Sequence, residues 1–125
     1  MPSEYGSNSV DTSKSRLVFV PPLPLNAIKK STFVMLVQRR SIEFIKILID
    51  YAKEQKMPIE CYIRHESTVK LLNEVLGLDL KPSNALYEYR DGDILVMVGL
   101  KKPVRGAEVT DVKLEDLDIA LAFIS

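Results

Sequence analysis

Short apolar runs typical of β-strands alternate with two stretches of helical periodicity along this chain of 125 residues. The first helical stretch begins at Ser41 and ends near Lys56, and the second begins after Arg64-His65 and ends at Gly77. In both, apolar residues recur three and four positions apart, which is typical of a helix with one buried face. The runs typical of strands are 16–20, 32–37, 59–63, 85–90, 93–100 and 119–124. The alternation predicts an α/β fold: a single domain with a mixed five- to six-stranded sheet and two main helices, which we expect to cover one sheet face.

An Asp-Gly pair marks a sharp turn late in the chain. Asp91-Gly92 lies between the runs 85–90 and 93–100, both of which favour strands. Asp-Gly between two such runs is typical of a β-hairpin, because glycine readily adopts the positive φ that the turn needs. The two runs are therefore predicted to be neighbouring antiparallel strands.

The beginning of the chain differs from the rest. Residues 1–15 are polar and rich in serine and show no apolar period, so we expect a flexible N-terminal tail. The remaining residues, 16–125, have the length of one ordinary domain. The sequence therefore predicts one tail and one domain, with no room for separate catalytic and binding domains.

The charge balance excludes one class of partner. The chain has 17 basic and 17 acidic side chains, and its formal net charge is zero. Proteins that coat long DNA or RNA need a large positive excess, because their affinity comes from neutralising phosphates. We therefore expect no long nucleic-acid partner. A small anionic ligand bound by a local cluster of basic residues is compatible with this balance.

Few residues are available for metal or disulfide chemistry. Cys61 is the only cysteine and His65 the only histidine, so one chain can form neither an internal disulfide nor an ordinary His/Cys zinc site. The sequence has no glycine-rich phosphate loop and no nucleophile elbow. We therefore expect no metal and no cofactor. The single cysteine, the lack of a secretory signal pattern and the shortness of the apolar runs predict a cytoplasmic protein with no membrane partner.

His65 is the natural candidate for a general acid. Histidine changes charge near neutral pH, and here it precedes Ser67 and Thr68, where the second helix is predicted to begin. The free N–H groups of a helix start attract anions, and two hydroxyls would add donors. A phosphate bound at this turn would lie beside His65. The alternative is structural: Ser67 or Thr68 only caps the helix, and His65 is a half-buried residue of the junction.

Basic residues are concentrated in the predicted connections between elements. They are Lys29-Lys30, Arg39-Arg40, Arg64, and Lys101-Lys102 with Arg105. Connections at one end of a sheet can converge on a ligand, although ordinary solvated loops have the same composition. Tyr87 and Tyr89 share one face of a predicted strand, where they are core, a dimer surface or a platform for stacking bases.

The start of the second helix resembles a motif of a known family. The residues Ile63-Arg64-His65-Glu66-Ser67-Thr68, followed by Leu76-Gly77, are similar to the isoleucine-glycine-histidine-x-serine/alanine-threonine helix start of the viral type III anti-CRISPR ring nucleases. The resemblance extends to the early Leu25-Asn26-Ala27, the acidic turn 91–93, the apolar run 94–100 and the basic loop ending at Gly106. It covers roughly residues 16–124 in the same order, although each motif is short.

This resemblance implies an activity. The family consists of small homodimeric proteins of archaeal viruses and some prokaryotes that degrade cyclic tetra-adenylate, the second messenger of type III CRISPR defence, without metal. In that reaction a ribose 2′-hydroxyl attacks the neighbouring phosphate, and a histidine, corresponding to His65, protonates the departing 5′-oxygen. The chain is thus predicted to be a metal-independent ring nuclease with a cyclic oligoadenylate as ligand and a second copy of itself as partner. Besides the catalytic His65, the predicted ligand-binding residues are Asn26, Arg64, Ser67, Thr68, Asn84, Lys102 and Arg105.

The sequence departs from the family pattern at several positions. Arg64 stands where the family has glycine, Arg105 stands where it has an acidic residue, and Ser83-Asn84 replaces an Asn-Arg pair. These departures leave two alternatives to the ring nuclease. One is a non-catalytic protein that binds or sequesters a cyclic nucleotide, and the other is a dimeric regulatory or scaffold protein of the same fold.

Overall fold

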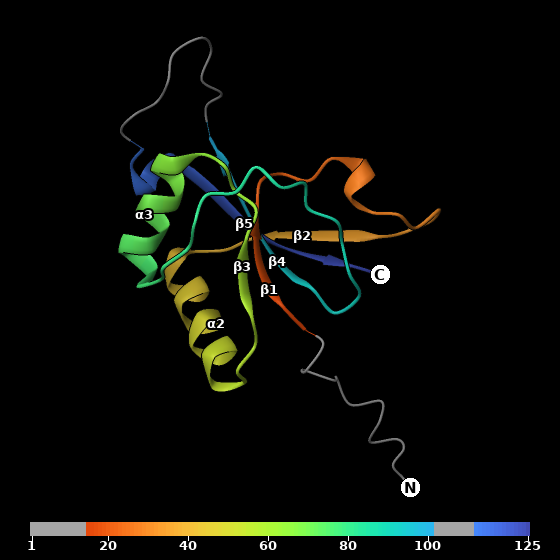
Figure 1. Cartoon of the computed structure of the whole chain (residues 1–125), viewed down its shortest axis with the longest axis horizontal. Helices are drawn as coiled ribbons and strands as arrows, with labels where there is room; N and C mark the ends of the chain where they lie inside the picture. Colours follow the sequence, from red (N-terminus) through yellow and green to blue (C-terminus); the bar gives the residue numbers. More distant parts are fainter. Residues whose placement is uncertain (1–14, 102–111) are drawn as a thin grey trace, which may run out of the picture.

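The computed structural model describes residues 15–101 and 112–125. Its sheet consists of β1 (Leu17–Val20), β2 (Met35–Arg39), β3 (Ile59–Cys61), β4 (Ile94–Leu100) and β5 (Leu117–Ile124). The described helices are α2 (Ile42–Glu54), α3 (Glu66–Leu76) and the 3₁₀ helices Leu25–Ala27 and Leu114–Asp116 (Figure 1). The predicted tail lies outside the described residues apart from Ser15, which is buried.

The strand order of the sheet is β2-β5-β4-β1-β3. β1 lies between β3 and β4 and is parallel to both, whereas β5 is antiparallel to β4 and β2. Every residue of β1 is fully buried, because a parallel strand that is covered on both faces exposes no side chain to water. The predicted α/β fold, a single domain with a mixed sheet and two main helices, is confirmed with five strands.

Both α-helices pack on the same face of the sheet, as predicted (Figure 1). Leu17 and Phe19 of β1 point to this face. The helices bury their apolar stripes against it, with Ile45, Ile49 and Ala52 from α2 and Val69, Leu72 and Leu76 from α3. Amphipathic periodicity therefore places the main core where the sequence predicts it.

Local chemistry sets the ends of the helices. The Ser41 hydroxyl accepts a hydrogen bond from the Phe44 N–H at 3.3 Å and caps α2. Gly77 ends α3 in the left-handed region at a φ of 67°, which glycine adopts without a steric penalty. Both ends agree with the sequence prediction. Within the described part of the chain, no helix combines the length and the apolar character that spanning a membrane requires.

The opposite face of the sheet is covered by parts of two segments that contain no described α-helix, 21–30 and 78–90, although Leu78 and Leu80 of the second segment pack in the core on the helix side. Val18 and Val20 of β1 point to this face and pack with Ala27 and Tyr87, one from each segment. A hydrogen bond of 2.8 Å from the Tyr89 N–H to the Ala27 carbonyl joins the two segments. This cover is therefore held together by individual contacts rather than by a repeating pattern.

The predicted hairpin at Asp91-Gly92 is wrong in its first strand. The turn itself exists: Gly92 has a φ of 93°, and the Asp93 N–H donates to the Arg90 carbonyl at 3.0 Å. Residues 85–90, however, form no strand. The reason is that β4 is already flanked by β1 on one side and by β5 on the other, so neither edge is open to the run that precedes it. Smaller differences concern β2, which begins later than the predicted run 32–37, and β3, which is shorter than 59–63.

Candidate functional site

A cavity of about 610 Å³ lies at the carboxyl ends of the parallel strands β1, β3 and β4. Its lining comes from segments 21–29, 62–68, 83–88 and 98–100. Ligands of open α/β sheets bind outside the carboxyl ends of the strands, where the connections are free to vary. The volume falls within the range of small-molecule sites, about 300–1,000 Å³. This cavity is therefore the candidate functional site.

Five predicted site residues line this cavity: Asn26, Arg64, His65, Thr68 and Asn84. Four of them come from three different connections, and Thr68 belongs to the first turn of α3. Asn26 lies in the 3₁₀ helix after β1, Arg64 and His65 lie between β3 and α3, and Asn84 lies in segment 78–90. The strand order thus brings together residues that are far apart in the sequence.

The other predicted residues lie elsewhere. Ser67 is not part of the cavity lining, although it belongs to the first turn of α3. Lys102 and Arg105 lie outside the described residues. No place in the cavity is therefore assigned to these three side chains.

The expected convergence of basic connections holds only in part. Lys29 and Arg64 line the cavity, whereas Lys30 and Arg39-Arg40 do not. Arg39 instead donates to Asp118 at 2.8 Å, across the strands β2 and β5. For Lys30 and Arg39-Arg40, the structure favours the alternative of ordinary solvated charges, because they lie outside the cavity lining.

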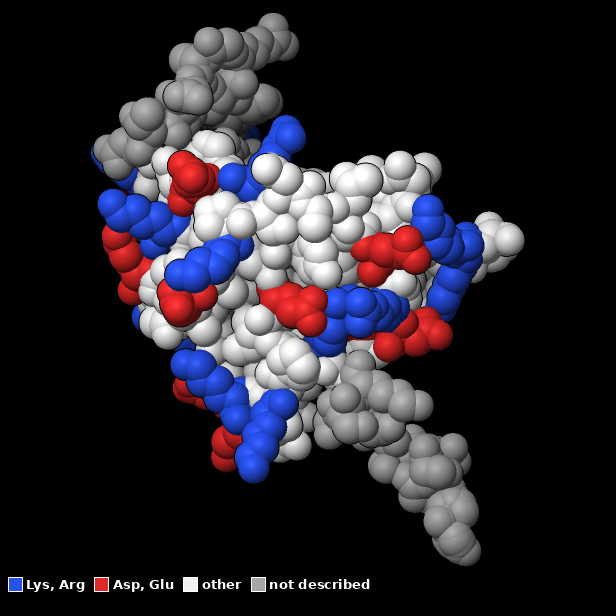
Figure 2. All heavy atoms as spheres, in the orientation of Figure 1, with Lys and Arg blue, Asp and Glu red and all other residues white. Residues whose placement is uncertain are grey.

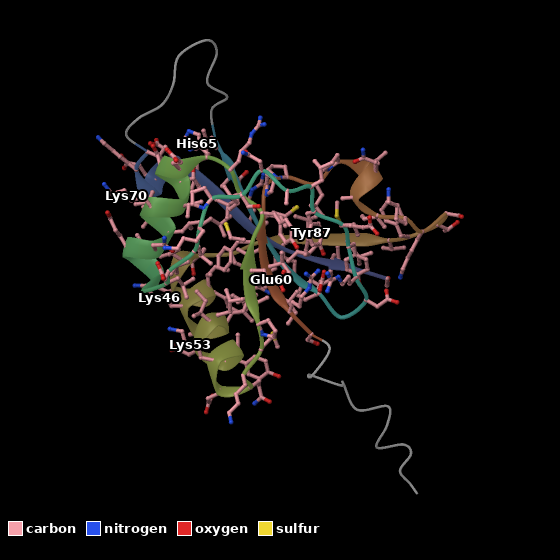
Figure 3. The ribbon with its side chains drawn as sticks, viewed as in Figure 1. Lys46, Lys53, Glu60, His65, Lys70 and Tyr87 are labelled. Atoms are coloured by element: carbon pink, nitrogen blue, oxygen red, sulfur yellow. The ribbon has the colours of Figure 1, made fainter. Side chains whose placement is uncertain are left out.

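His65 caps α3 and lines the cavity at the same time (Figure 3). Its Nδ1 atom accepts a hydrogen bond from the Thr68 N–H at 3.3 Å and lies 2.8 Å from the Thr68 hydroxyl oxygen. A ring nitrogen that accepts from a backbone N–H carries no proton, so the proton of the neutral ring lies on Nε2. The structural alternative is wrong in two respects: the cap is His65 rather than Ser67 or Thr68, and His65 is exposed rather than half-buried.

The amino end of α3 adjoins the cavity, as an anion site at this turn requires. Thr68 is buried and belongs to the lining. The Thr68 N–H already donates to His65, but the helix dipole adds partial positive charge at this end of α3. Lys29 and Arg64 add two full positive charges to the lining, against one negative charge from Glu88. The lining is thus locally positive although the chain is neutral overall.

A buried ion pair lies at the amino ends of β1 and β4, outside the cavity lining, and was not predicted from the sequence. Arg16, directly before β1, donates from Nε and Nη2 to the two carboxylate oxygens of Asp93, directly before β4, at 2.8 and 2.6 Å. Arg16 also donates to Glu60 at 2.8 Å, and the Tyr87 hydroxyl donates to Asp93. In the sequence, Arg16 and Asp93 are visible only as charged residues that directly precede the apolar residues 17–20 and 94–98. No motif describes such a pair.

The ion pair changes the proton affinity of its neighbours. The hydrogen bond with Asp93 raises the pKa of Arg16. Burial raises the pKa of Tyr87, and the hydrogen bond to Asp93 raises it further. Both groups therefore keep their protons at neutral pH, so that Tyr87 stays a donor to Asp93.

Charges of both signs are interspersed on the face of the molecule in Figure 2. Acidic and basic side chains lie next to each other, and a mostly uncharged area extends between α3 and the first 3₁₀ helix. A protein that follows a long nucleic acid needs a broad basic stripe instead. On this face, the distribution favours a small ligand over an extended one.

Comparisons with known proteins bear on the fold. No model of a protein family and no curated protein matches the chain. Among solved structures, the chain is similar to B116 of Sulfolobus turreted icosahedral virus, with a TM-score of 0.68 over 86% of this chain and 98% of that one. At 14% identity the likeness concerns the fold alone, so the ring nuclease family stays a prediction. This chain therefore shares the fold of a protein from a Sulfolobus virus.

Proposed function

We propose that this protein is a metal-independent ring nuclease that cleaves cyclic tetra-adenylate and thereby switches off type III CRISPR signalling. The observation that carries the proposal is the position of the only histidine. His65 caps a helix start in the wall of a cavity that also contains Asn26, Thr68 and Asn84. The resemblance of the motif at residues 63–68 to that of the ring nucleases adds support.

The proposed reaction is an internal displacement at phosphorus. A ribose 2′-oxygen forms a bond to the neighbouring phosphorus and releases its proton to solvent. The bond from phosphorus to the 5′-oxygen breaks, and Nε2 of the protonated His65 donates a proton to the departing oxygen. The product is a linear oligoadenylate with a 2′,3′-cyclic phosphate at one end and a 5′-hydroxyl at the other.

Thr68 would hold the His65 ring in both charge states. In the neutral ring, Nδ1 accepts from the Thr68 N–H at 3.3 Å. In the protonated ring, Nδ1 becomes a donor, and the Thr68 hydroxyl oxygen at 2.8 Å can accept from it. The ring therefore does not need to turn between gaining and donating its proton.

The symmetry of the substrate favours a homodimer. Cyclic tetra-adenylate has equivalent phosphates around its ring, and an isologous dimer presents equal surfaces across a two-fold axis. Two copies of the cavity would place two His65 side chains against one ring. We therefore include a homodimer in the proposal.

The decisive experiment is cleavage of cyclic tetra-adenylate in EDTA by the wild type, His65→Asn and His65→Ala, with analysis of the products. Asparagine is a favoured N-cap, so His65→Asn retains the cap of α3 but has no proton to donate. We expect its rate to fall by about 10²–10⁴-fold with little change in thermal stability. His65→Ala should lose both the rate and part of the stability. Unchanged cleavage by His65→Asn would exclude His65 as the general acid.

The same cavity supports a second candidate, a protein that sequesters the cyclic nucleotide without cleaving it. Arg64, in place of the family's glycine, and Lys29 both line the cavity as cations. Charges that hold the phosphates equally in the ground state and the transition state increase affinity but not rate. Tight binding in calorimetry with no linear product after hours would favour this candidate. No binding to any cyclic oligoadenylate of a panel would favour a regulatory or scaffold protein.

A further inference from the structure

One wall of the cavity, residues 83–88, has no regular secondary structure. Backbone hydrogen bonds hold it near its two ends. The Ser83 N–H donates to the Ile63 carbonyl at 3.0 Å, and the Tyr89 N–H donates to the Ala27 carbonyl at 2.8 Å. Between these two hydrogen bonds, the position of the wall depends on the side chains that it buries.

Tyr87 is the buried residue in this wall. Its exposure is 8%, whereas that of the neighbouring Leu86 is 92%. The Tyr87 ring meets the Tyr62 ring edge-to-face, with ring centres 5.2 Å apart, and the Tyr87 hydroxyl donates to Asp93. Tyr62 also lines the cavity, so the two rings connect this wall to the chain that leads from β3 to His65.

The carboxylate that accepts from Tyr87 is itself held in place. The Asp93 side chain is fully buried, receives two hydrogen bonds from Arg16 and accepts a third from the Arg90 N–H at 3.1 Å. Among the described residues, every buried side-chain nitrogen or oxygen has a hydrogen-bond partner. A buried ion pair adds little net stability, because desolvation offsets the attraction between the charges, but its geometry can specify the position of its neighbours.

We propose that Tyr87 is a positioning residue, which ties the wall 83–88 to the sheet through Asp93 and Arg16 and so sets the place of Asn84 relative to His65. In Figure 3, Tyr87 and Glu60 lie near the centre of the sheet and His65 lies at the upper end of α3. The Tyr87 hydroxyl faces the ion pair, so it takes no part in the chemistry. The effect on catalysis rests on the proposed function, whereas the tether can be tested without substrate.

The test compares Tyr87→Phe with a matched control, Tyr89→Phe. Each variant removes one hydroxyl from the same segment and keeps the ring. The Tyr89 hydroxyl donates to the Ile124 carbonyl at 3.3 Å, and Tyr89 does not line the cavity. With cyclic tetra-adenylate as substrate, we expect Tyr87→Phe to raise KM on the order of tenfold and to change kcat far less, because the wall is displaced while His65 is intact. Tyr89→Phe should retain the wild-type values.

Amide hydrogen exchange gives a readout that is independent of turnover. Amide exchange at residues 84–86 should be faster in Tyr87→Phe than in Tyr89→Phe. The amides of β1 serve as the internal reference, and the temperature is one at which both variants are folded. If the two variants exchange at equal rates, Tyr87 does not hold the wall. If Tyr87→Phe exchanges faster but both variants have the same KM, Tyr87 holds the wall but does not position it for the substrate. If the wild type neither binds nor cleaves the cyclic nucleotide, the proposed function fails, and exchange alone decides whether Tyr87 holds the wall.

Discussion

The two faces of the sheet are covered by different kinds of structure, regular helices on one and irregular segments on the other. On one face, α2 and α3 bury regular apolar stripes against β1. On the other, segments 21–30 and 78–90 form an irregular cover, and these segments supply much of the cavity lining. A helix satisfies its own backbone groups, whereas an irregular segment can turn polar backbone and side-chain groups toward a ligand. Stability is therefore expected mainly from the first face and binding from the second.

The two α-helix starts repeat this contrast. Ser41 caps α2 with a hydroxyl and lies away from the cavity lining. His65 caps α3 with a ring nitrogen and is part of that lining. Serine is a favoured cap and histidine is not, so the less usual cap is found at the helix start that also lines the cavity.

Leu72→Ala tests the helix-covered face and has the largest expected effect on stability. Leu72 is 1% exposed and packs in the core between α3 and the sheet. Truncating it leaves a cavity, so the free energy of unfolding in urea should fall by about 2–5 kcal/mol. The matched control is Leu86→Ala on the irregular side, where the side chain is 92% exposed and the expected change is within about 0.5 kcal/mol. Equal losses in the two variants would contradict the contrast between the faces.

Ser41→Ala sharpens the comparison of the two helix starts. The variant removes the hydroxyl that accepts from the Phe44 N–H, so the free energy of unfolding should fall by about 1 kcal/mol. Because no α2 residue lines the cavity, KM and kcat should keep their wild-type values. This is the reverse of the outcome expected for His65→Asn. A loss of cleavage in Ser41→Ala at a temperature at which it is folded would show that the two helix starts are not independent.

Asp118→Asn tests an ion pair that belongs to neither covering layer, and its effect should be the smallest. Arg39 donates to the Asp118 carboxylate at 2.8 and 3.1 Å, and this hydrogen bond lowers the pKa of Asp118 below its ordinary value of 3.8. A carboxyl group with a lower pKa in the folded state stabilises the protein above its unfolded pKa and loses that contribution as the pH falls through the folded pKa. Since the Arg39 side chain is 80% exposed, solvent screens the pair, and we expect a loss of stability smaller than that of Ser41→Ala even at low salt.

Unfolding in urea at a series of pH values measures this contribution. The stability difference between the wild type and Asp118→Asn should be present at neutral pH and should disappear at low pH, below the lowered pKa of Asp118, where the carboxyl group is protonated in both the folded and the unfolded state. High salt should reduce the difference at neutral pH. A difference of equal size at both pH values would mean that the charge of Asp118 does not matter.

Local patterns were sufficient to predict the regular elements and part of the site. The helix predicted from Ser41 is α2 with Ser41 as its cap, and Gly77 ends α3 as predicted. The junction at Arg64-His65 was also visible, because it lies between an apolar run and a stretch of helical periodicity. The partners Arg16 and Asp93 are 77 positions apart, and no local pattern relates them. The tether of Tyr87 was missed for that reason.

By itself, the sequence determined the α/β class, the two amphipathic helices, the neutral charge balance and the single histidine at a helix start. Only the tertiary structure decided that β4 pairs with β1 and β5 instead of with residues 85–90, and that Asn26 and Asn84 share one cavity with His65. The physical reason is range. Periodicity and capping act between residues a few positions apart, whereas strand partners and buried ion pairs result from competition among all segments for a limited number of strand edges and buried positions.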